Sequence, residues 1–390
     1  MRSTTGFVSA ALCLWACGHS SVTEVSRAQA AVDTAYAIQG EYQGVNAANG
    51  NVWAAQVSAR GGGNFRLLLL KGGLPGQGWN GQAGRILTGT LNGAAATFIQ
   101  NGFNLSIAAA GDSMRGTNDS GQRLGLAKVH RQSPTLNQAP PTGATVLFDG
   151  TSLAAWTNAS ARLDSNRFLI PQGSFSTGGA VTTQSFGDFT LHLEFQLPFE
   201  PDASGQGRAN SGVSIQNRYE VQILDSFGES FADLATTDSI EPTRQCGGVW
   251  EQSAALINMT FPPLTWQTYD IDFTAARWDS LGHKVQNARL TMRHNGVFIH
   301  SDRNIPGSTL QGAAESSANG PNRLQYHGHD IPFKNIWIVP HAASSKIAPA
   351  ILKRQGSLHI QTKATRYALA NPLLPFLLFP DGRILGLPGI

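Results

Sequence analysis

Two stretches of the chain alternate apolar and polar residues so regularly that they predict β-strands. Residues 189–197 read FTLHLEFQL, and residues 219–223 read YEVQI. Successive side chains of an extended strand point to opposite faces, so each stretch has one apolar and one polar face. Further strands are expected at 266–273, 288–294, 297–300 and 333–339. Strands of this kind pack their apolar faces against a second sheet, which predicts a two-sheet sandwich.

Shorter apolar segments precede this region and predict a separate, smaller all-β domain. They lie at 52–57, 65–70, 95–99, 105–108 and 124–129. Gly-rich turns such as Asn92-Gly93 and Asn101-Gly102 separate them, a pattern typical of β-hairpins. The four consecutive leucines at 67–70 predict a strand that is buried on both faces.

The boundaries between these regions follow from composition. Residues 133–143 read SPTLNQAPPTG, which predicts a stiff linker between a domain at 36–132 and a larger one at 144–340. In the tail, 341–390, residues 356–361 fit one more strand. The apolar, Pro-broken stretch 371–390 follows neither period, and we assign it no fold.

Composition and charge narrow the possible partners. The 390 residues include 28 Lys and Arg against 25 Asp and Glu, a net charge of +3, which is too nearly neutral for a protein that binds nucleic acid through phosphate contacts. With 43 Gly, 19 Pro and 14% charged residues, the chain favours short strands joined by turns. No interior stretch reaches the roughly 18 apolar residues of a membrane span.

The N-terminus resembles an export signal. Arg2 precedes an apolar run at 6–16, and LWAC at 14–17 resembles a bacterial lipobox in which Cys17 would carry lipid. We therefore expect a signal peptide at 1–17, a tether at 18–35, and a location in the cell envelope or periplasm, with membrane contact only through the lipid. Cleavage after Ala30 and a fortuitous Cys17 are the alternatives. In either case Cys13 leaves with the leader and Cys17 is lipidated or removed. Cys246 is then the remaining cysteine, so no disulfide framework is expected.

An ordered set of motifs resembles the 3-keto-disaccharide hydrolase family. The motifs include VLFDG at 146–150, YEVQILD at 219–225, CGG at 246–248, HG at 327–328 and FKNIW at 333–337. The match extends over about 146–340, and the smaller domain resembles the region that accompanies this family in some bacterial members. The resemblance implies a concanavalin-A-like jelly roll that acts on glycosides whose sugar carries a ketone at C3.

Such chemistry needs a base for the C2 hydrogen, an acid for the leaving oxygen and a donor for the enolate oxygen. Glu220, in the family motif Y-E-x-Q, is the first candidate for the base, although a glutamate on an outer sheet face bound to Arg218 would look the same. His327 is the second candidate, although it also fits a hydrogen-bonding loop, and Asp225 is the third. A divalent metal could polarise the ketone, but no zinc-binding spacing is present.

Substrate contacts are expected from polar strand faces and from one aromatic ring. The candidates for binding the carbohydrate are Gln222, Arg218, Glu194, Gln325 and, at the rim of a cleft, Trp250. The sequence does not show whether the strands that carry them are neighbours.

Two other functions fit the same sandwich. One is a non-catalytic, lectin-like carbohydrate-binding module, because a fold does not fix a function. The other is a laminarinase-like retaining glycosidase, since residues 220, 222 and 225 have the spacing of its carboxylate signature. Here the middle residue is an amide, and residues 220 and 225 fall on opposite strand faces unless a bulge intervenes. Elimination followed by hydration is therefore the mechanism we favour.

Overall fold

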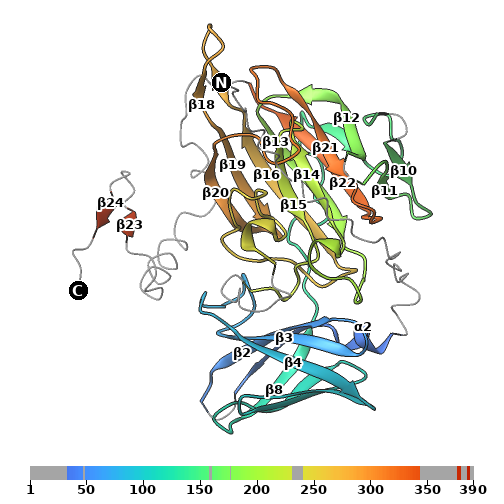
Figure 1. Cartoon of the computed structure of the whole chain (residues 1–390), viewed down its shortest axis with the longest axis vertical. Coiled ribbons are helices and arrows are strands. Elements are labelled where there is room, and N and C mark those ends of the chain that lie inside the picture. The colour runs from blue at the N-terminus through green and yellow to red at the C-terminus, as the bar shows by residue number, and fades with distance from the viewer. Residues whose placement is uncertain are drawn as a thin grey trace, which may run out of the picture.

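The computed structural model describes residues 33–46, 49–157, 160–175, 177–230 and 240–342, together with the backbone of 376–378 and 384–386. The described chain forms a β-barrel followed by a larger β-sandwich (Figure 1). The expected leader, Cys17 and most of the tether lie outside the described residues, as does the strand expected at 356–361.

The first domain is a closed barrel of eight antiparallel strands in chain order, in which β1 pairs with β8. A short helix, α2 (Thr34–Ile38), precedes it, capped by Asp33. The strands are β1 (Gly40–Val45), β2 (Val52–Ala59), β3 (Asn64–Lys71), β4 (Arg85–Asn92), β5 (Ala95–Gln100), β6 (Phe103–Ala108), β7 (Ser113–Thr117) and β8 (Arg123–Val129). The prediction of a small all-β domain is confirmed.

Strand β3 is buried on both faces, as the run of leucines predicted. Leu67 and Leu69 belong to the core inside the barrel. Leu68 and Leu70 form a second, outer cluster with Leu74, which lies in the Gly-rich loop that follows β3. The loop therefore acts as a cover for the outer face of this strand.

The second domain is an antiparallel sandwich of two main sheets, which confirms the sandwich prediction. The larger sheet has the order β10-β11-β22-β13-β16-β19-β20, with β9 also paired to β22; the smaller has the order β12-β21-β14-β15. The larger sheet contains β9 (Thr145–Phe148), β10 (Ala161–Leu163), β11 (Leu169–Pro171), β13 (Phe189–Gln196), β16 (Trp266–Thr274), β19 (Ala288–His294), β20 (Val297–Ile305) and β22 (Phe333–Pro340). The smaller contains β12 (Gly179–Phe186), β14 (Ser211–Ile215), β15 (Tyr219–Ile223) and β21 (Gly320–Gln325).

The core of the sandwich lies between the apolar faces that the alternation defined. Leu191 and Leu193 of β13 and Val221 and Ile223 of β15 all belong to it. Buried Cys246 is a free cysteine within the same core. The remaining elements are the hairpin β17 (Arg277–Trp278) and β18 (Lys284–Gln286), two 3-10 turns, η1 (Gly205–Gly207) and η2 (Pro242–Arg244), and the pair β23 (Phe376–Leu378) and β24 (Ile384–Gly386), where we assigned no fold.

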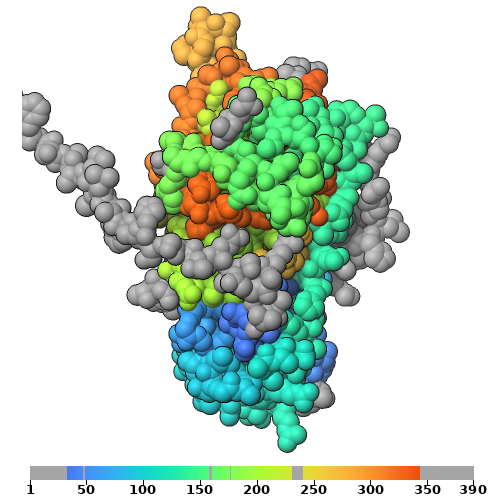
Figure 2. Space-filling view, turned by 90° about the vertical axis from the view of Figure 1, so that its right-hand side faces the viewer, coloured from blue at the N-terminus to red at the C-terminus, as the bar shows by residue number. Residues whose placement is uncertain are grey.

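The segment expected to be a plain linker also packs along the sandwich. After the barrel the chain runs up the side of the second domain (Figure 2). The hydroxyl of Ser133 lies 2.6 Å from that of Thr268, and the Thr135 hydroxyl donates to Asp270 Oδ2 at 2.8 Å. The short polar side chains that suggested a linker by composition here form hydrogen bonds with polar side chains of β16 in the larger sheet. Residues 137–143 are exposed throughout, and of these 139–143 follow the last residue that bonds to the sandwich.

The two domains also meet directly. Phe199, which follows β13, is fully buried in the core of the barrel, where its ring packs edge-on against Tyr36 at 5.3 Å between centroids. Arg131, just after β8, places its guanidinium 4.8 Å from the ring centroid of Phe261 in the sandwich. Within the described residues, none of the helices has the length and apolar character needed to cross a membrane.

Candidate functional site

The smaller sheet carries a row of three polar side chains on the face turned away from the core. Strand β14 pairs with both β15 and β21, and Ser214 is the register partner of Glu220 on one side and of Arg323 on the other. Side chains at paired positions share a sheet face. Residues about 100 positions apart in sequence, Glu220 and Arg323, are thereby held in one line across the sheet.

A second row lies one step along the strands and is centred on a glycine. Gly212 is the register partner of Gln222, and on its other side it faces Gln325. A Cβ atom at Gly212 would lie 2.3 Å from Gln325 Oε1 and 3.4 Å from Glu220 Cγ. The missing side chain therefore gives the Gln325 amide room to lie over the sheet, where it hydrogen-bonds Glu220.

Glu220 is a buried carboxyl group with a strongly shifted pKa. It is 8% exposed, and burial raises its pKa to about 7. The hydrogen bond with Gln325 and the charge of Arg323 act in the opposite direction, while Glu251 adds to the rise. A carboxyl group with a pKa near neutrality can both take and return a proton at neutral pH, which is the property required of a general base.

His327 lies just beyond the end of β21 and also contacts the Gln325 amide. Its Nδ1 donates to the carbonyl of Phe175 at 2.8 Å, since a carbonyl oxygen can only accept. In the neutral ring Nε2 then carries the lone pair, so its approach of 3.3 Å to Gln325 Oε1 joins two acceptors and is a contact, not a hydrogen bond. Burial lowers the pKa of His327 against the effect of the Phe175 carbonyl, and the charges of Arg323 and His329 lower it further.

Several polar atoms on this face are buried without a partner in the described part of the chain. They include Arg323 Nε and Gln222 Oε1. Other groups of these side chains have partners. Arg323 Nη1 donates to the carbonyl of Thr177 at 3.4 Å, and Gln222 Nε2 donates to Gln206 Oε1 at 2.9 Å. Buried polar groups are usually satisfied, so these atoms indicate a place for a polar ligand.

Two aromatic residues lie beside the rows. The backbone N–H of Trp250 donates to the Glu220 carbonyl at 3.1 Å, and the Arg244 guanidinium lies 5.5 Å from the centroid of the Trp250 ring. Phe175, which is 56% exposed, packs edge-on against His327 at 5.5 Å between centroids. Aromatic rings beside a polar floor are suited to the apolar face of a sugar.

Asp225 and Arg218 are engaged elsewhere. Asp225 is buried at the end of β15, where Arg208 Nε donates to its Oδ2 at 2.5 Å. The Arg218 guanidinium donates to Gln216 Oε1, to the hydroxyl of Ser316 and to two backbone carbonyls of the loop at 314–318. Neither residue is therefore brought into the Glu220 cluster.

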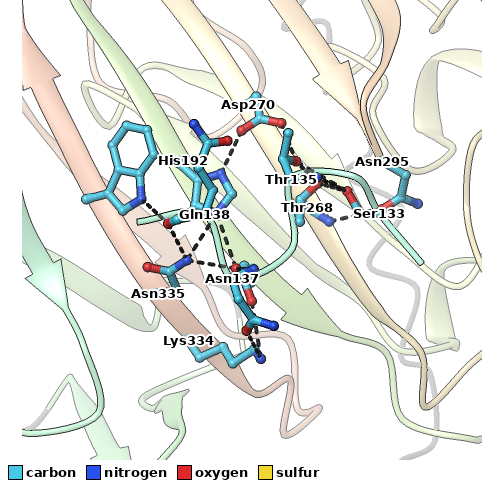
Figure 3. Close-up of polar contacts among 12 residues, drawn as sticks. Ser133, Thr135, Asn137, Gln138, His192, Thr268, Asp270, Asn295, Lys334 and Asn335 are labelled. Carbon is cyan, nitrogen blue, oxygen red and sulfur yellow. Dashed lines mark hydrogen bonds and ion pairs between the residues drawn. The ribbon is translucent and has the colours of Figure 1, made fainter. Parts of the chain in front are cut away.

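Glu194 lies on the opposite, outer face of the larger sheet, where it contacts the 133–138 segment. Figure 3 shows how Asn137 and Gln138 of this segment lie beside His192 and Asn335. The backbone N–H of Asn137 and the amide of Asn335 donate to it, and His192 Nε2 lies 3.4 Å from its Oε1. Burial acts to raise the pKa of Glu194, but these hydrogen bonds and the charge of Lys334 outweigh it and lower the pKa. The structure thus separates Glu194 from Glu220 by the thickness of the sandwich.

Residues 143–339 match the model of the 3-keto-alpha-glucoside-1,2-lyase-like domain, and this match covers just over half of the chain. The chain belongs to this family. The resemblance expected from the sequence motifs is thereby confirmed, and the cluster around Glu220 lies within the lyase-like domain.

Two solved structures from Parabacteroides distasonis ATCC 8503, each named "putative glycosyl hydrolase", are similar to the chain. One is 30% identical over 52% of this chain and 85% of that chain, with a TM-score of 0.44. The other is 15% identical over 51% of this chain and 95% of that chain, with a TM-score of 0.39. A search of curated proteins gave no match.

A metal site in the lyase-like domain is not formed by the described residues, because no three His, Cys, Asp or Glu side chains in this part of the chain are grouped to hold an ion.

Gly212 and Phe175 of the cluster were not singled out from the sequence as binding residues, and Arg323 was noted only as a polar group on the strand of Gln325 and His327, without a binding role. Arg323 and Gly212 enter it only through the pairing of β14 with β21, and Phe175 enters through a loop more than 140 residues before His327. The glycine after two polar residues at 210–212 was the available signal for Gly212, because glycine inside a strand often marks a close approach.

Proposed function

We propose that the protein cleaves the glycosidic bond of 3-keto glycosides by removal of the C2 proton, elimination and hydration. The observation that carries the proposal is the row on the smaller sheet, in which buried Glu220, with a pKa of about 7, faces Arg323 across Ser214. Arg323 Nε has no hydrogen-bond partner among the described residues. Membership of the lyase-like family supports a 3-keto sugar as the substrate class.

In the proposed reaction the ketone at C3 acidifies the hydrogen on C2, and the ionised Glu220 takes that proton. The electron pair moves toward the C3 oxygen, where the Arg323 guanidinium stabilises the developing negative charge. Collapse of the enolate forms a C1=C2 double bond and expels the C1 oxygen, which receives the proton from Glu220.

Hydration then completes the hydrolysis. The His327 Nε2 lone pair accepts a proton from water as the hydroxyl adds to C1, and a solvent-derived proton is delivered to C2. The balance is one water consumed per bond cleaved. The pKa of His327 lies below its usual value, so its ring is neutral and able to accept at neutral pH.

The proposal is tested with Glu220→Gln, which keeps the side-chain shape but cannot accept a proton. Turnover of a 3-keto disaccharide should fall about 100-fold or more, while substrate binding survives. In heavy water the wild-type enzyme should place deuterium at C2 of the released sugar. Product without deuterium at C2 would contradict elimination and favour direct displacement at C1, whereas binding without any turnover in the wild type would indicate a carbohydrate-binding module.

We also propose that the protein is exported and held by lipid on Cys17, from the lipobox-like sequence at 14–17. Cys17→Ala should move the protein from the membrane fraction to the soluble fraction. A mature wild-type N-terminus at Ala31 would contradict the lipid anchor.

A further inference from the structure

A second candidate site lies on the barrel, in a different domain from Glu220. A cavity of about 590 Å³ opens on the outer surface of β3, β4 and β5, which pair in this order. Figure 1 shows β3 and β4 side by side. The residues that give it chemical character are Arg60, Arg66, Thr88, Thr90, Thr97 and Ile99. These strands alternate, so the neighbours Leu67, Leu87, Ala96 and Phe98 point into the core of the barrel.

The guanidinium groups of Arg60 and Arg66 line this cavity, and that of Arg208 lies near Arg60, where the barrel meets the sandwich. Arg60 and Arg66 both form ion pairs with Glu229, the latter at 2.9 Å, and Arg208 pairs with Asp225. Among the described residues, the carboxylates paired with these three guanidinium groups are Glu229 and Asp225. One positive charge is therefore left without a matching carboxylate.

The donors of these guanidinium groups are not used up by the ion pairs. In the described part of the chain, Arg66 Nε and Nη2, Arg60 Nε and Arg208 Nη2 are all buried without a hydrogen-bond partner. Arg66 is 6% exposed and lines the cavity. A buried guanidinium with two free donors is a strong site for a carboxylate or another oxyanion, because the guanidinium fork matches the two oxygen atoms.

The rest of the cavity is suited to more than a bare ion. Its volume falls within the range of about 300–1,000 Å³ that is typical of small-molecule sites. Thr88, Thr90 and Thr97 present hydroxyl groups on its wall, and Ile99, which is 70% exposed, presents an apolar surface. Hydroxyl groups beside an apolar patch match the alternating polar and C–H surface of a sugar ring.

We infer that this cavity binds an acidic sugar, whose carboxylate group is held by Arg66. The site would hold an anionic part of a carbohydrate away from the catalytic face. The choice of a sugar rests on the proposed function, whereas the anion site rests on the geometry alone.

The test is a calorimetric titration of the full chain carrying Glu220→Gln with glucuronate, glucose and inorganic sulfate. Glucuronate should bind, and glucose and sulfate should each bind at least 10-fold more weakly. Arg66→Met should weaken glucuronate at least 10-fold. Arg115→Met, at an exposed arginine on β7, is the matched control and should leave binding unchanged.

Thr90→Val changes an exposed side chain and keeps the inference testable even if Arg66→Met does not fold. It should weaken glucuronate about threefold or more. No glucuronate binding, sulfate binding as tight as glucuronate binding, or equal losses in Arg66→Met and Arg115→Met would overturn the inference. Because the titration does not depend on turnover, glucuronate binding by a protein that cleaves no 3-keto glycoside would contradict only the proposed function.

Discussion

At the scale of single residues, Glu220 departs from what folding alone would select. A buried carboxyl group with few donors costs stability whenever it is ionised. Its pKa of about 7 means that the folded protein holds a proton that the unfolded chain has already released. The sequence motif pointed to Glu220, but its environment depends on Gln325 and Arg323, which the sequence does not place beside it.

This pKa gives a pH-dependent prediction. Between the ordinary pKa of 4.5 and about 7, the folded state binds more protons at Glu220 than the unfolded state, so stability falls as pH rises through this window. Glu220→Gln removes that loss. The difference in unfolding free energy between the variant and the wild type should therefore be more favourable to the variant at pH 8 than at pH 4.5, by on the order of 1–3 kcal/mol. Denaturant unfolding at both pH values measures this. An equal difference at the two pH values would contradict the raised pKa.

Gly212 allows a test of whether the Gln325 amide organises the cluster. In Gly212→Ala the new Cβ would lie 2.3 Å from Gln325 Oε1, so the flexible amide must move away from Glu220. We expect kcat/KM to fall about 10-fold or more, with only a small change in melting temperature. Gly307→Ala, where a Cβ would meet nothing within 4 Å, is the control. Equal activity of the two variants would show that the position of Gln325 is unimportant.

At the scale of strands, alternation predicted which side chains share a face but not which faces meet. Glu194 and Glu220 look equivalent in sequence, because each lies at a polar position of a regular strand. The structure places Glu194 under the 133–138 segment and Glu220 in the row with Ser214 and Arg323, since β13 and β15 belong to different sheets. Sheet membership depends on pairings between distant segments, which no local pattern encodes.

The 133–138 segment gives the prediction at this scale. The Thr135 hydroxyl contacts Thr268 Oγ1 and Asp270 Oδ2, both at 2.8 Å. Thr135→Val removes both contacts, while Thr268 keeps Ser133 and Asp270 keeps His192, and should cost about 1 kcal/mol of unfolding free energy. Thr142→Val, at an exposed position of the same connection, should be near neutral. Activity should be unchanged in both variants, because Thr135 lies on the face opposite Glu220; equal stability of the two variants would contradict a structural role.

At the scale of the whole molecule, two regions of regular alternation and a Pro-rich break predicted two domains. The contact between them was not predictable, because it relies on single residues. Phe199 follows a strand of the sandwich yet completes the core of the barrel, and Arg208 of the sandwich donates to the carbonyl of Ala59 at 2.9 Å. A lone Phe or Arg after a strand carries no local sign of such a role.

Proteolysis tests whether this contact holds the molecule together. Residues 139–143 are exposed, whereas 133–138 is hydrogen-bonded to the sandwich, so limited proteolysis should cut within 139–143. The two fragments should then elute together in size-exclusion chromatography, because Phe199 is fully buried in the barrel.

Phe199→Ala removes a side chain whose burial is worth about 3–5 kcal/mol and should let the nicked fragments separate. Phe298→Ala, at a residue 48% exposed on the sandwich, should leave them associated. Separation of the nicked wild-type protein would show that the covalent connection, not the interface, holds the two domains together.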